Sequence, residues 1–221
     1  MFNTAFSDRL AHKSIFSLFF AGLVKLSSLI KVSFIIGSYT AFFSMTSVMM
    51  PLSGMCGPLM AILISALGIS FKLAIGSSLT LKFLAYHVPG LFAALYWSTD
   101  GFFTRILVPF ACVLAFICNP VGYQIWAYSL FWLIPMAIGL LKKKPLFLQA
   151  LGSTLTAHAV GTAIWIWAVP TTPAFWLMLV PVVIIERIVF ALGSVIMYKV
   201  LNYSFKAMKK QARFTAFIAL K

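Results

Sequence analysis

The sequence predicts an all-α fold, a polytopic integral membrane helix bundle of about six transmembrane helices. The predicted range is six to eight, with one irregular or re-entrant segment. Hydrophobic residues make up 62% of the chain and charged residues 9%, whereas soluble domains are about 45–50% apolar and about 25% charged. A span needs about 20 mostly apolar residues to cross a hydrocarbon core of about 30 Å. The 221 residues therefore allow six to eight spans and little else.

The N-terminal segment, residues 1–31, is predicted to be amphipathic. It would lie in the membrane interface or lead into the first span without being cleaved. Its apolar run is followed by Lys25 and Lys31, where a signal peptide would have small residues. Small or polar side chains recur at helical spacing and would form one narrow stripe along the helix. The stripe consists of Ser14, Ser17, Ala21, Lys25 and Ser28.

The transmembrane domain is predicted over residues 32–203. The second apolar segment is short, and the third is interrupted by Lys82, His87 and the Pro89–Gly90 pair. Short apolar runs are more often re-entrant or buried than spanning, and irregular backbone at membrane depth needs protein or a water-filled cavity around it. These two segments are therefore predicted to share one irregular crossing. The apolar segments cover residues 33–50, 57–71, 79–97, 104–120, 124–141, 146–169 and 174–200.

The distribution of basic residues predicts that both termini are cytoplasmic. Basic clusters lie at Lys142–Lys144 and in the tail, residues 204–221, whereas the VPTTP loop before the last segment is uncharged. Cytoplasmic loops carry the excess of Lys and Arg, so the number of crossings is even: six, or eight if the N-terminal segment spans. The predicted location is a cell membrane of the bacterial inner-membrane type.

The net charge of +14 predicts contact with the anionic lipid of the cytoplasmic leaflet rather than with nucleic acid. The basic residues lie mostly between apolar runs, as the positive-inside rule requires, and not on one soluble face. The tail is either a cytoplasmic helix on anionic lipid or a topological stop signal.

Glu186 is the only glutamate of the chain and lies in the last apolar segment beside Arg187. It follows Ala174 by twelve residues, which places it about 18 Å into a helix, near the bilayer midplane. A charge at that depth faces the protein interior and has a partner. Sequence neighbours point about 100° apart on a helix. The partner of Glu186 is therefore predicted on another helix, in water or in a ligand, rather than at Arg187.

His158 is predicted at the same depth on the preceding, antiparallel helix. Ser153, Ala157 and Gly161 follow each other at steps of four on that helix and form a small-residue stripe that lets another backbone approach closely. His158 lies beside this stripe. It is either a hydrogen-bonding contact between helices or part of a polar, solute-binding or proton-coupled site.

The predicted solute-binding residues are therefore Glu186, Arg187, His158, His87 and Trp132. His87 is included because it adjoins the Pro89–Gly90 pair, and interrupted segments often form the binding sites of transporters. Trp132 is included because, unlike the other tryptophans, it lies inside an apolar segment. No catalytic residues, metal site or cofactor are predicted, since paired acidic residues and nucleophile motifs are missing from the sequence.

The order of these features resembles the substrate-binding S components of energy-coupling factor vitamin transporters. The similarity covers about residues 33–200 and rests on three stretches. These are SYTAFFSMTSVMMPLSGMCGPLMAILISALG, HVPGLFAALYW and the closing hairpin with His158 and Glu186. The family's first helix usually carries an Ala-x-x-x-Ala contact for a coupling subunit, and this chain has Gly37 and Ala41 at that spacing.

The resemblance implies six helices with cytoplasmic termini and an irregular loop that helps to close the substrate site. It also implies capture of a vitamin-like solute, with energy supplied by a transmembrane coupling subunit and partner ATPases. The expected function is thus a membrane transport component that binds a small organic solute near the midplane. The alternative is a non-transporting scaffold or assembly subunit, or a small membrane-embedded enzyme.

Overall fold

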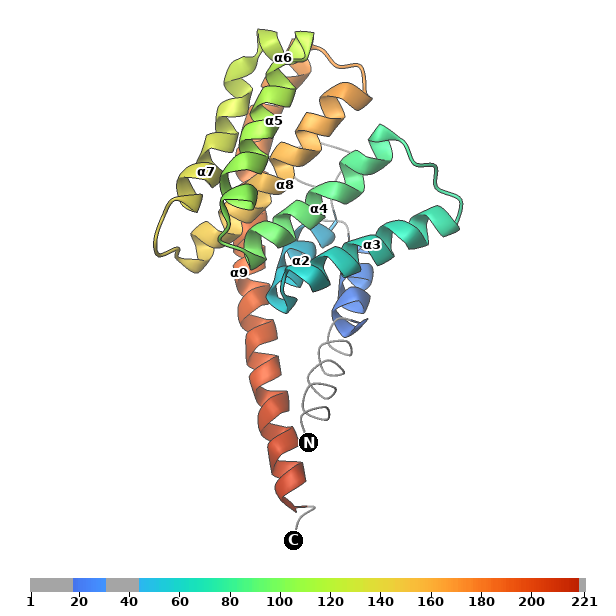
Figure 1. The fold of residues 1–221 in the computed structure, drawn as a ribbon, viewed down its shortest axis with the longest axis vertical. Helices are drawn as coiled ribbons and strands as arrows, with labels where there is room; N and C mark the ends of the chain where they lie inside the picture. The colour runs from blue at the N-terminus through green and yellow to red at the C-terminus, as the bar shows by residue number, and fades with distance from the viewer. Residues whose placement is uncertain (1–17, 31–43, 219–221) are drawn as a thin grey trace.

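The computed structural model describes residues 18–30 and 44–218, and this part of the chain is helical without a β-strand (Figure 1). The all-α prediction is confirmed. Parts of several predictions lie outside the described residues, namely Ser14 and Ser17 of the N-terminal stripe, the Gly37/Ala41 pair, and most of the 33–50 segment.

The helices follow the predicted apolar segments closely from residue 57 onward. A short apolar helix over Leu18–Ser27 precedes them. The elements are α2 (Thr46–Leu52), the 3₁₀ helix η1 (Ser53–Cys56), α3 (Pro58–Ala74), α4 (Leu81–Ser98), the π-helical turn η2 (Phe103–Leu107), α5 (Val108–Ile117), α6 (Pro120–Gln124), the 3₁₀ helix η3 (Trp126–Trp132), α7 (Leu133–Gly139), α8 (Leu146–Ala168) and α9 (Pro173–Ile218).

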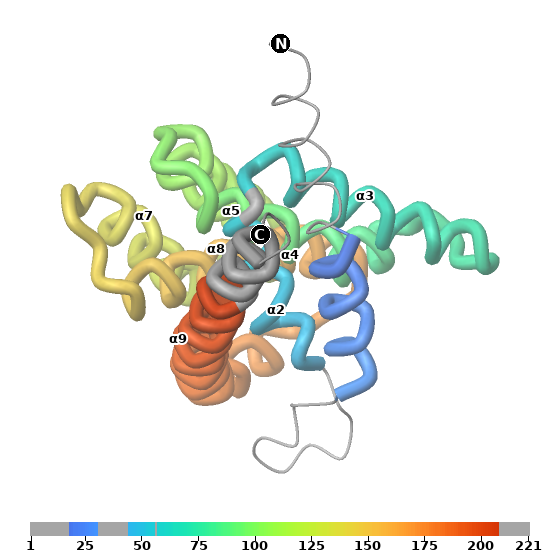
Figure 2. The backbone as a smooth tube through the Cα atoms, turned by 90° about the horizontal axis from the view of Figure 1, so that it is seen from below, coloured from blue at the N-terminus to red at the C-terminus, as the bar shows by residue number. Residues whose placement is uncertain are grey.

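Helix α8 is the centre of the fold and contacts α4, α5, α7 and α9. In Figure 2, α3 and α7 lie on opposite sides of the molecule, with α4 and α8 between them. The predicted small-residue stripe explains the close contact with α4. The Ser153 hydroxyl donates to the Ala93 carbonyl at 2.7 Å, and a side chain at Gly161 would meet Pro89 Cγ at 3.2 Å. The prediction of a close helix approach at this stripe is confirmed.

Besides the π-helical turn η2, two regions depart from a regular α-helix in the described part of the chain, where the sequence predicted one irregular segment. The first is at η1, where α2 ends and the chain turns at Gly57, whose φ of +93° favours glycine. It precedes the two segments that were predicted to share one irregular crossing, and these two segments form the continuous helices α3 and α4. The second falls in the 124–141 segment, which is split into η3 and α7. Pro135 accounts for it, because a proline lacks an N–H and its ring obstructs the α-helical carbonyl four residues earlier.

The Pro89–Gly90 pair does not interrupt α4, which corrects the prediction of a broken third segment. The helix is continuous from Leu81 to Ser98 with Pro89 inside it. Both residues lie at close contacts with neighbouring elements, since a side chain at Gly90 would collide with Met50 Cγ at 2.7 Å. The helix begins at a clear cap, because the Thr80 hydroxyl accepts from the Phe83 N–H at 3.1 Å.

Helix α9 spans 46 residues, about 69 Å of helix, and extends well beyond the rest of the bundle (Figure 1). It runs without a break through residue 203, where the sequence predicted that the tail begins. Among the described helices, its part Pro173–Ala207 is the one that is long and apolar enough to cross a membrane.

Candidate solute-binding cavity

A cavity of about 1110 Å³ lies among α2, α3, α4, α8, α9 and the Leu18–Ser27 helix. Its walls are mainly apolar. Polar groups line it on α8 and α9, and also on the Leu18–Ser27 helix and on α3, which contribute Lys25 and Lys72. Of the predicted site residues, Glu186, Arg187, His158 and His87 line the cavity, and Trp132 does not. The described members of the predicted N-terminal stripe, Ala21, Lys25 and Ser28, also line it.

Glu186 and Arg187 form an ion pair with each other, which corrects the predicted partner assignment. Arg187 Nη2 donates to Glu186 Oε2 at 3.1 Å, and the two side chains are only 6% and 8% exposed. The prediction considered the directions in which neighbouring residues leave a helix. It did not consider that the arginine side chain is long and carries several donors in a planar guanidinium, so that it can bend toward the carboxylate of the preceding residue.

The arginine also joins the two helices of the closing hairpin. Arg187 Nη1 donates to the Thr154 carbonyl of α8 at 3.3 Å, and its guanidinium lies 4.8 Å from the centre of the Phe190 ring. One side chain therefore holds the buried carboxylate, the neighbouring helix and an aromatic face. These contacts hold both charged groups in the same wall of the cavity.

His158 has different partners from those predicted. Its Nε2 lies 3.1 Å from the Tyr128 hydroxyl, and its Nδ1 lies 3.5 Å from the Thr162 hydroxyl. No hydrogen bond joins His158 to Glu186 in the described part of the chain, although both line the same cavity. The imidazole is therefore held between η3 and its own helix, and it adds a second polar group to the wall that carries the ion pair.

His87 approaches the cavity from α4. Its Nδ1 donates to the Phe83 carbonyl at 2.8 Å, and its ring stacks on the Phe83 ring with centroids 4.1 Å apart. These two contacts fix the ring plane. Because Nδ1 carries the proton, Nε2 is the ring atom that can accept a hydrogen bond.

Trp132 lies behind the cavity wall, in the hydrophobic core. The side chain is fully buried and packs edge-on against Phe116, with ring centroids 5.2 Å apart. The sequence therefore identified a buried aromatic residue but not a cavity wall. The wall is formed by Tyr128, one helical turn earlier, whose ring contacts both Trp132 and Trp176.

Sequence reasoning missed the aromatic side chains of the cavity. Trp165 and Trp176 lie near the ends of apolar segments, which predicts a position at the membrane interface. In the structure both line the cavity together with Tyr86. Tyr86 and Trp165 meet edge-on with centroids 5.5 Å apart. Tyr128 belongs to a 3₁₀ helix, where the helical period that assigns faces no longer applies, so no pattern in the sequence pointed to it.

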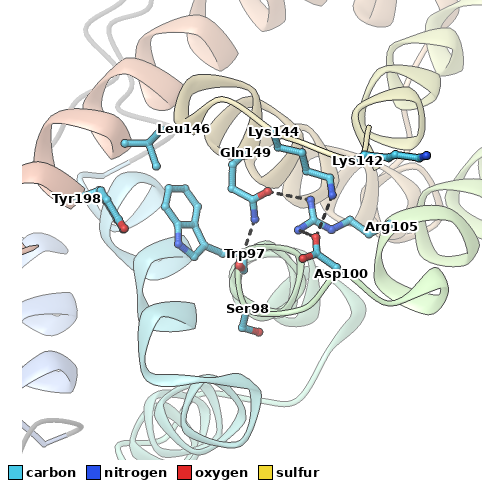
Figure 3. A pocket seen from close by; sticks show the side chains of 9 residues that line it. All are labelled: Trp97, Ser98, Asp100, Arg105, Lys142, Lys144, Leu146, Gln149 and Tyr198. Carbon is cyan, nitrogen blue, oxygen red and sulfur yellow. Dashed lines mark hydrogen bonds and ion pairs between the residues drawn. The ribbon is translucent and has the colours of Figure 1, made fainter. Parts of the chain in front are cut away.

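A second polar cluster joins the end of α4 to the start of α8 (Figure 3). Asp100 Oδ1 accepts from Arg105 Nη2 at 2.9 Å and from Lys144 Nζ at 3.0 Å. The hydrogen bond from Lys144 is the main reason that the pKa of the Asp100 carboxyl is lowered from its ordinary value. Gln149 completes the cluster by accepting from Arg105 Nη1 at 3.0 Å and donating to the carbonyl of Trp97 at 3.1 Å.

Comparison of the chain with protein-family models, curated proteins and solved structures returned no match.

Proposed function

We propose that this chain is a multi-pass integral membrane transport component that binds a small, vitamin-like organic solute near the bilayer midplane. The observation that carries the proposal is the large cavity whose polar wall consists of the Glu186–Arg187 pair and His158. Its volume of about 1110 Å³ is slightly above the typical range of ligand pockets, which are about 300–1,000 Å³ and mostly apolar with a few polar groups.

The exposed apolar side chains support a lipid environment for the bundle as a whole. Large aliphatic and aromatic residues are exposed along α3, α5 and α9, including Leu59 (62%), Phe71 (52%) and Leu177 (59%). Soluble monomers rarely expose extensive apolar patches. In the proposed topology, the Lys142–Lys144 loop and both termini face the cytoplasm and the VPTTP loop faces outward.

The charge of the polar wall limits the chemistry of the solute. The Glu186–Arg187 pair is neutral as a unit, but Lys25 and Lys72 also line the cavity, so its lining carries a formal charge of 3 − 1 = +2. A cationic solute would therefore remain uncompensated, whereas a neutral, zwitterionic or anionic solute would not. The solute that fits has both hydrogen-bond donors and acceptors for Glu186, Arg187 and His158. It also has a flat apolar part for the rings of Trp165 and Trp176. By the family resemblance, a transmembrane coupling subunit and ATPases would supply the energy for its transport.

The structural alternative is a scaffold or assembly subunit that transports nothing. One observation favours it: Glu186 and Arg187 satisfy each other within the chain, so the pair can join helices without a ligand. The two functions differ in whether the cavity is occupied by a specific solute.

The test is thermal unfolding of the purified full-length chain with a panel of neutral, zwitterionic and anionic vitamin-like solutes. Glu186→Gln and His158→Ala alter the polar wall. Ser153→Ala is the matched control, because Ser153 is buried and hydrogen-bonded on the same helix but does not line the cavity. At least one solute should raise the Tm of the native chain and the control, and raise it less in the two wall variants.

Two outcomes would count against the proposal. If no solute in the panel shifts the Tm of the native chain, the binding function is not supported and the scaffold function is favoured. If a solute shifts the native chain and the wall variants equally, binding occurs but not at Glu186 and His158.

A further inference from the structure

A second, smaller pocket of about 360 Å³ lies at the junction of α4, η2, α8 and α9, and it shares no lining residue with the central cavity. Figure 3 shows the Asp100 cluster along one side and the rings of Trp97 and Tyr198 along the other. These two rings are 5.8 Å apart between centroids. The pocket thus combines a charged side with an aromatic side.

The charged side has an excess of positive charge. Three cations, Arg105, Lys142 and Lys144, line the pocket with one carboxylate, Asp100, so the formal charge is 3 − 1 = +2. Lys144 is largely covered, with 13% of its side chain exposed, whereas Asp100 is 78% exposed. Asp100 and Lys142 are thus open to water, whereas Arg105 and Lys144 are mostly covered. One carboxylate neutralises the three cations only in part.

The three cations differ in their capacity to bind a ligand. Each nitrogen of the Arg105 guanidinium already donates to a protein oxygen: the Thr99 carbonyl, Gln149 and Asp100. Arg105 therefore contributes fixed charge and a rigid wall. Lys142 makes no hydrogen bond or ion pair within the described residues, and Lys144 is bonded only to Asp100. The lysines are the donors available to an anion.

We infer that this pocket binds a phosphate group through Lys142 and Lys144, with the buried charge of Arg105 behind them. A phosphate matches the excess charge and the several ammonium donors, since lysine binds phosphate as a compact point charge. Basic pockets between helices at a membrane surface hold anionic lipid head groups, and Trp and Tyr favour the depth of those head groups. The phosphate is carried either by an anionic phospholipid or by a soluble phosphate, and the inference does not rest on the proposed transport function.

The experiment uses the full-length chain in a neutral detergent. Native mass spectrometry measures retention of phosphatidylglycerol against phosphatidylcholine, and thermal unfolding with inorganic phosphate tests the soluble source. Lys142→Ala and Lys142→Ala/Lys144→Ala remove the donors, and Lys142→Ala leaves every observed contact intact, so folding is not at risk. Lys143→Ala is the matched control, because it removes the same charge from the same loop but Lys143 does not line the pocket.

We expect each pocket lysine to strengthen phosphatidylglycerol retention about fivefold, the usual contribution of one basic residue near anionic lipid. The preference should therefore fall about fivefold in Lys142→Ala and further in the double variant, and remain in Lys143→Ala. Stabilisation by inorganic phosphate without a lipid preference, again lost in the double variant, would support the site with a soluble ligand. An equal loss in Lys143→Ala, or no binding of either probe by the native chain, would overturn the inference.

Discussion

Replacing Glu186 by glutamine should destabilise the folded chain by about 3–5 kcal/mol, the usual cost of removing one partner of a buried ion pair. The structure supports a value in this range. The charged atoms are 3.1 Å apart and both side chains are less than 10% exposed, at 6% and 8%. Coulomb's law at an effective dielectric constant of about 20 gives an attraction of about 5 kcal/mol at that distance. A chain of this size loses about 2–4 °C in Tm per kcal/mol, so the Tm should fall by about 6–20 °C.

A double variant separates the charge interaction from the packing of the two side chains. Glu186→Gln leaves the Arg187 guanidinium buried without a counter-charge, whereas Glu186→Gln/Arg187→Met leaves neither charge. The double variant should therefore be more stable than Glu186→Gln alone, because buried pairs replaced together by neutral groups are often tolerated. The single variant Arg187→Met completes the cycle. Thermal unfolding of the native chain and the three variants, followed by tryptophan fluorescence in one detergent, gives the coupling energy directly.

The reasoning would be refuted by either of two results. A Tm of Glu186→Gln within about 2 °C of the native chain, which is less than about 1 kcal/mol, would mean that the carboxylate does not compensate Arg187. Destabilisations that add without coupling would mean that the two side chains act independently.

Three further changes test the packing and the second polar cluster. Ser153→Ala removes a buried hydrogen bond to the α4 backbone and should cost about 1 kcal/mol, seen as a Tm lower by about 2–4 °C; an unchanged Tm would contradict that role. Tyr128→Phe, which removes the hydroxyl from the buried imidazole, should cost a similar amount, whereas Tyr123→Phe, at a 70% exposed ring, should cost nothing measurable. Because the pKa of Asp100 is lowered in the folded chain, its ion pairs stabilise the fold at pH values above the ordinary pKa of 3.8. This stabilisation is lost as the pH falls through the lower pKa of the folded chain. The difference in Tm between the native chain and Asp100→Asn should therefore be constant near neutral pH and narrow below about pH 4; a difference independent of pH would contradict it.

The apolar segments could be predicted from the sequence because their signal is local. Length and hydrophobicity decide whether a run forms a helix, and each predicted segment from residue 57 onward contains helix in the structure. The stripe of Ser153, Ala157 and Gly161 could also be predicted, since residues four positions apart lie on the same face of a helix. Counting residues from the helix ends predicted a similar depth for His158 and Glu186, and in the structure both residues line the same cavity.

Contacts that depend on side-chain reach or on irregular backbone could not be predicted. The Glu186–Arg187 pair depends on how far a long side chain bends, which the helical wheel does not describe. Tyr128 faces the cavity because η3 is a 3₁₀ helix, so its face could not be counted from the α-helical period. Pro89 lies inside a continuous α4. The close packing of α4 against α8 determines the surroundings of Pro89, and the sequence pattern carries no information about this packing.

Small side chains on α8 account for both the packing of the bundle and the space inside it. Ala157 and Gly161 belong to the stripe that approaches α4, and both also line the central cavity. A bundle selected only for a filled core would place larger apolar residues at such positions, because interiors are packed to high density and voids are costly. Both small residues line the same cavity as His158 and the Glu186–Arg187 pair. The close approach of α8 to α4 and the open volume beside these polar groups therefore depend on the same small side chains, so enlarging Ala157 or Gly161 would change both.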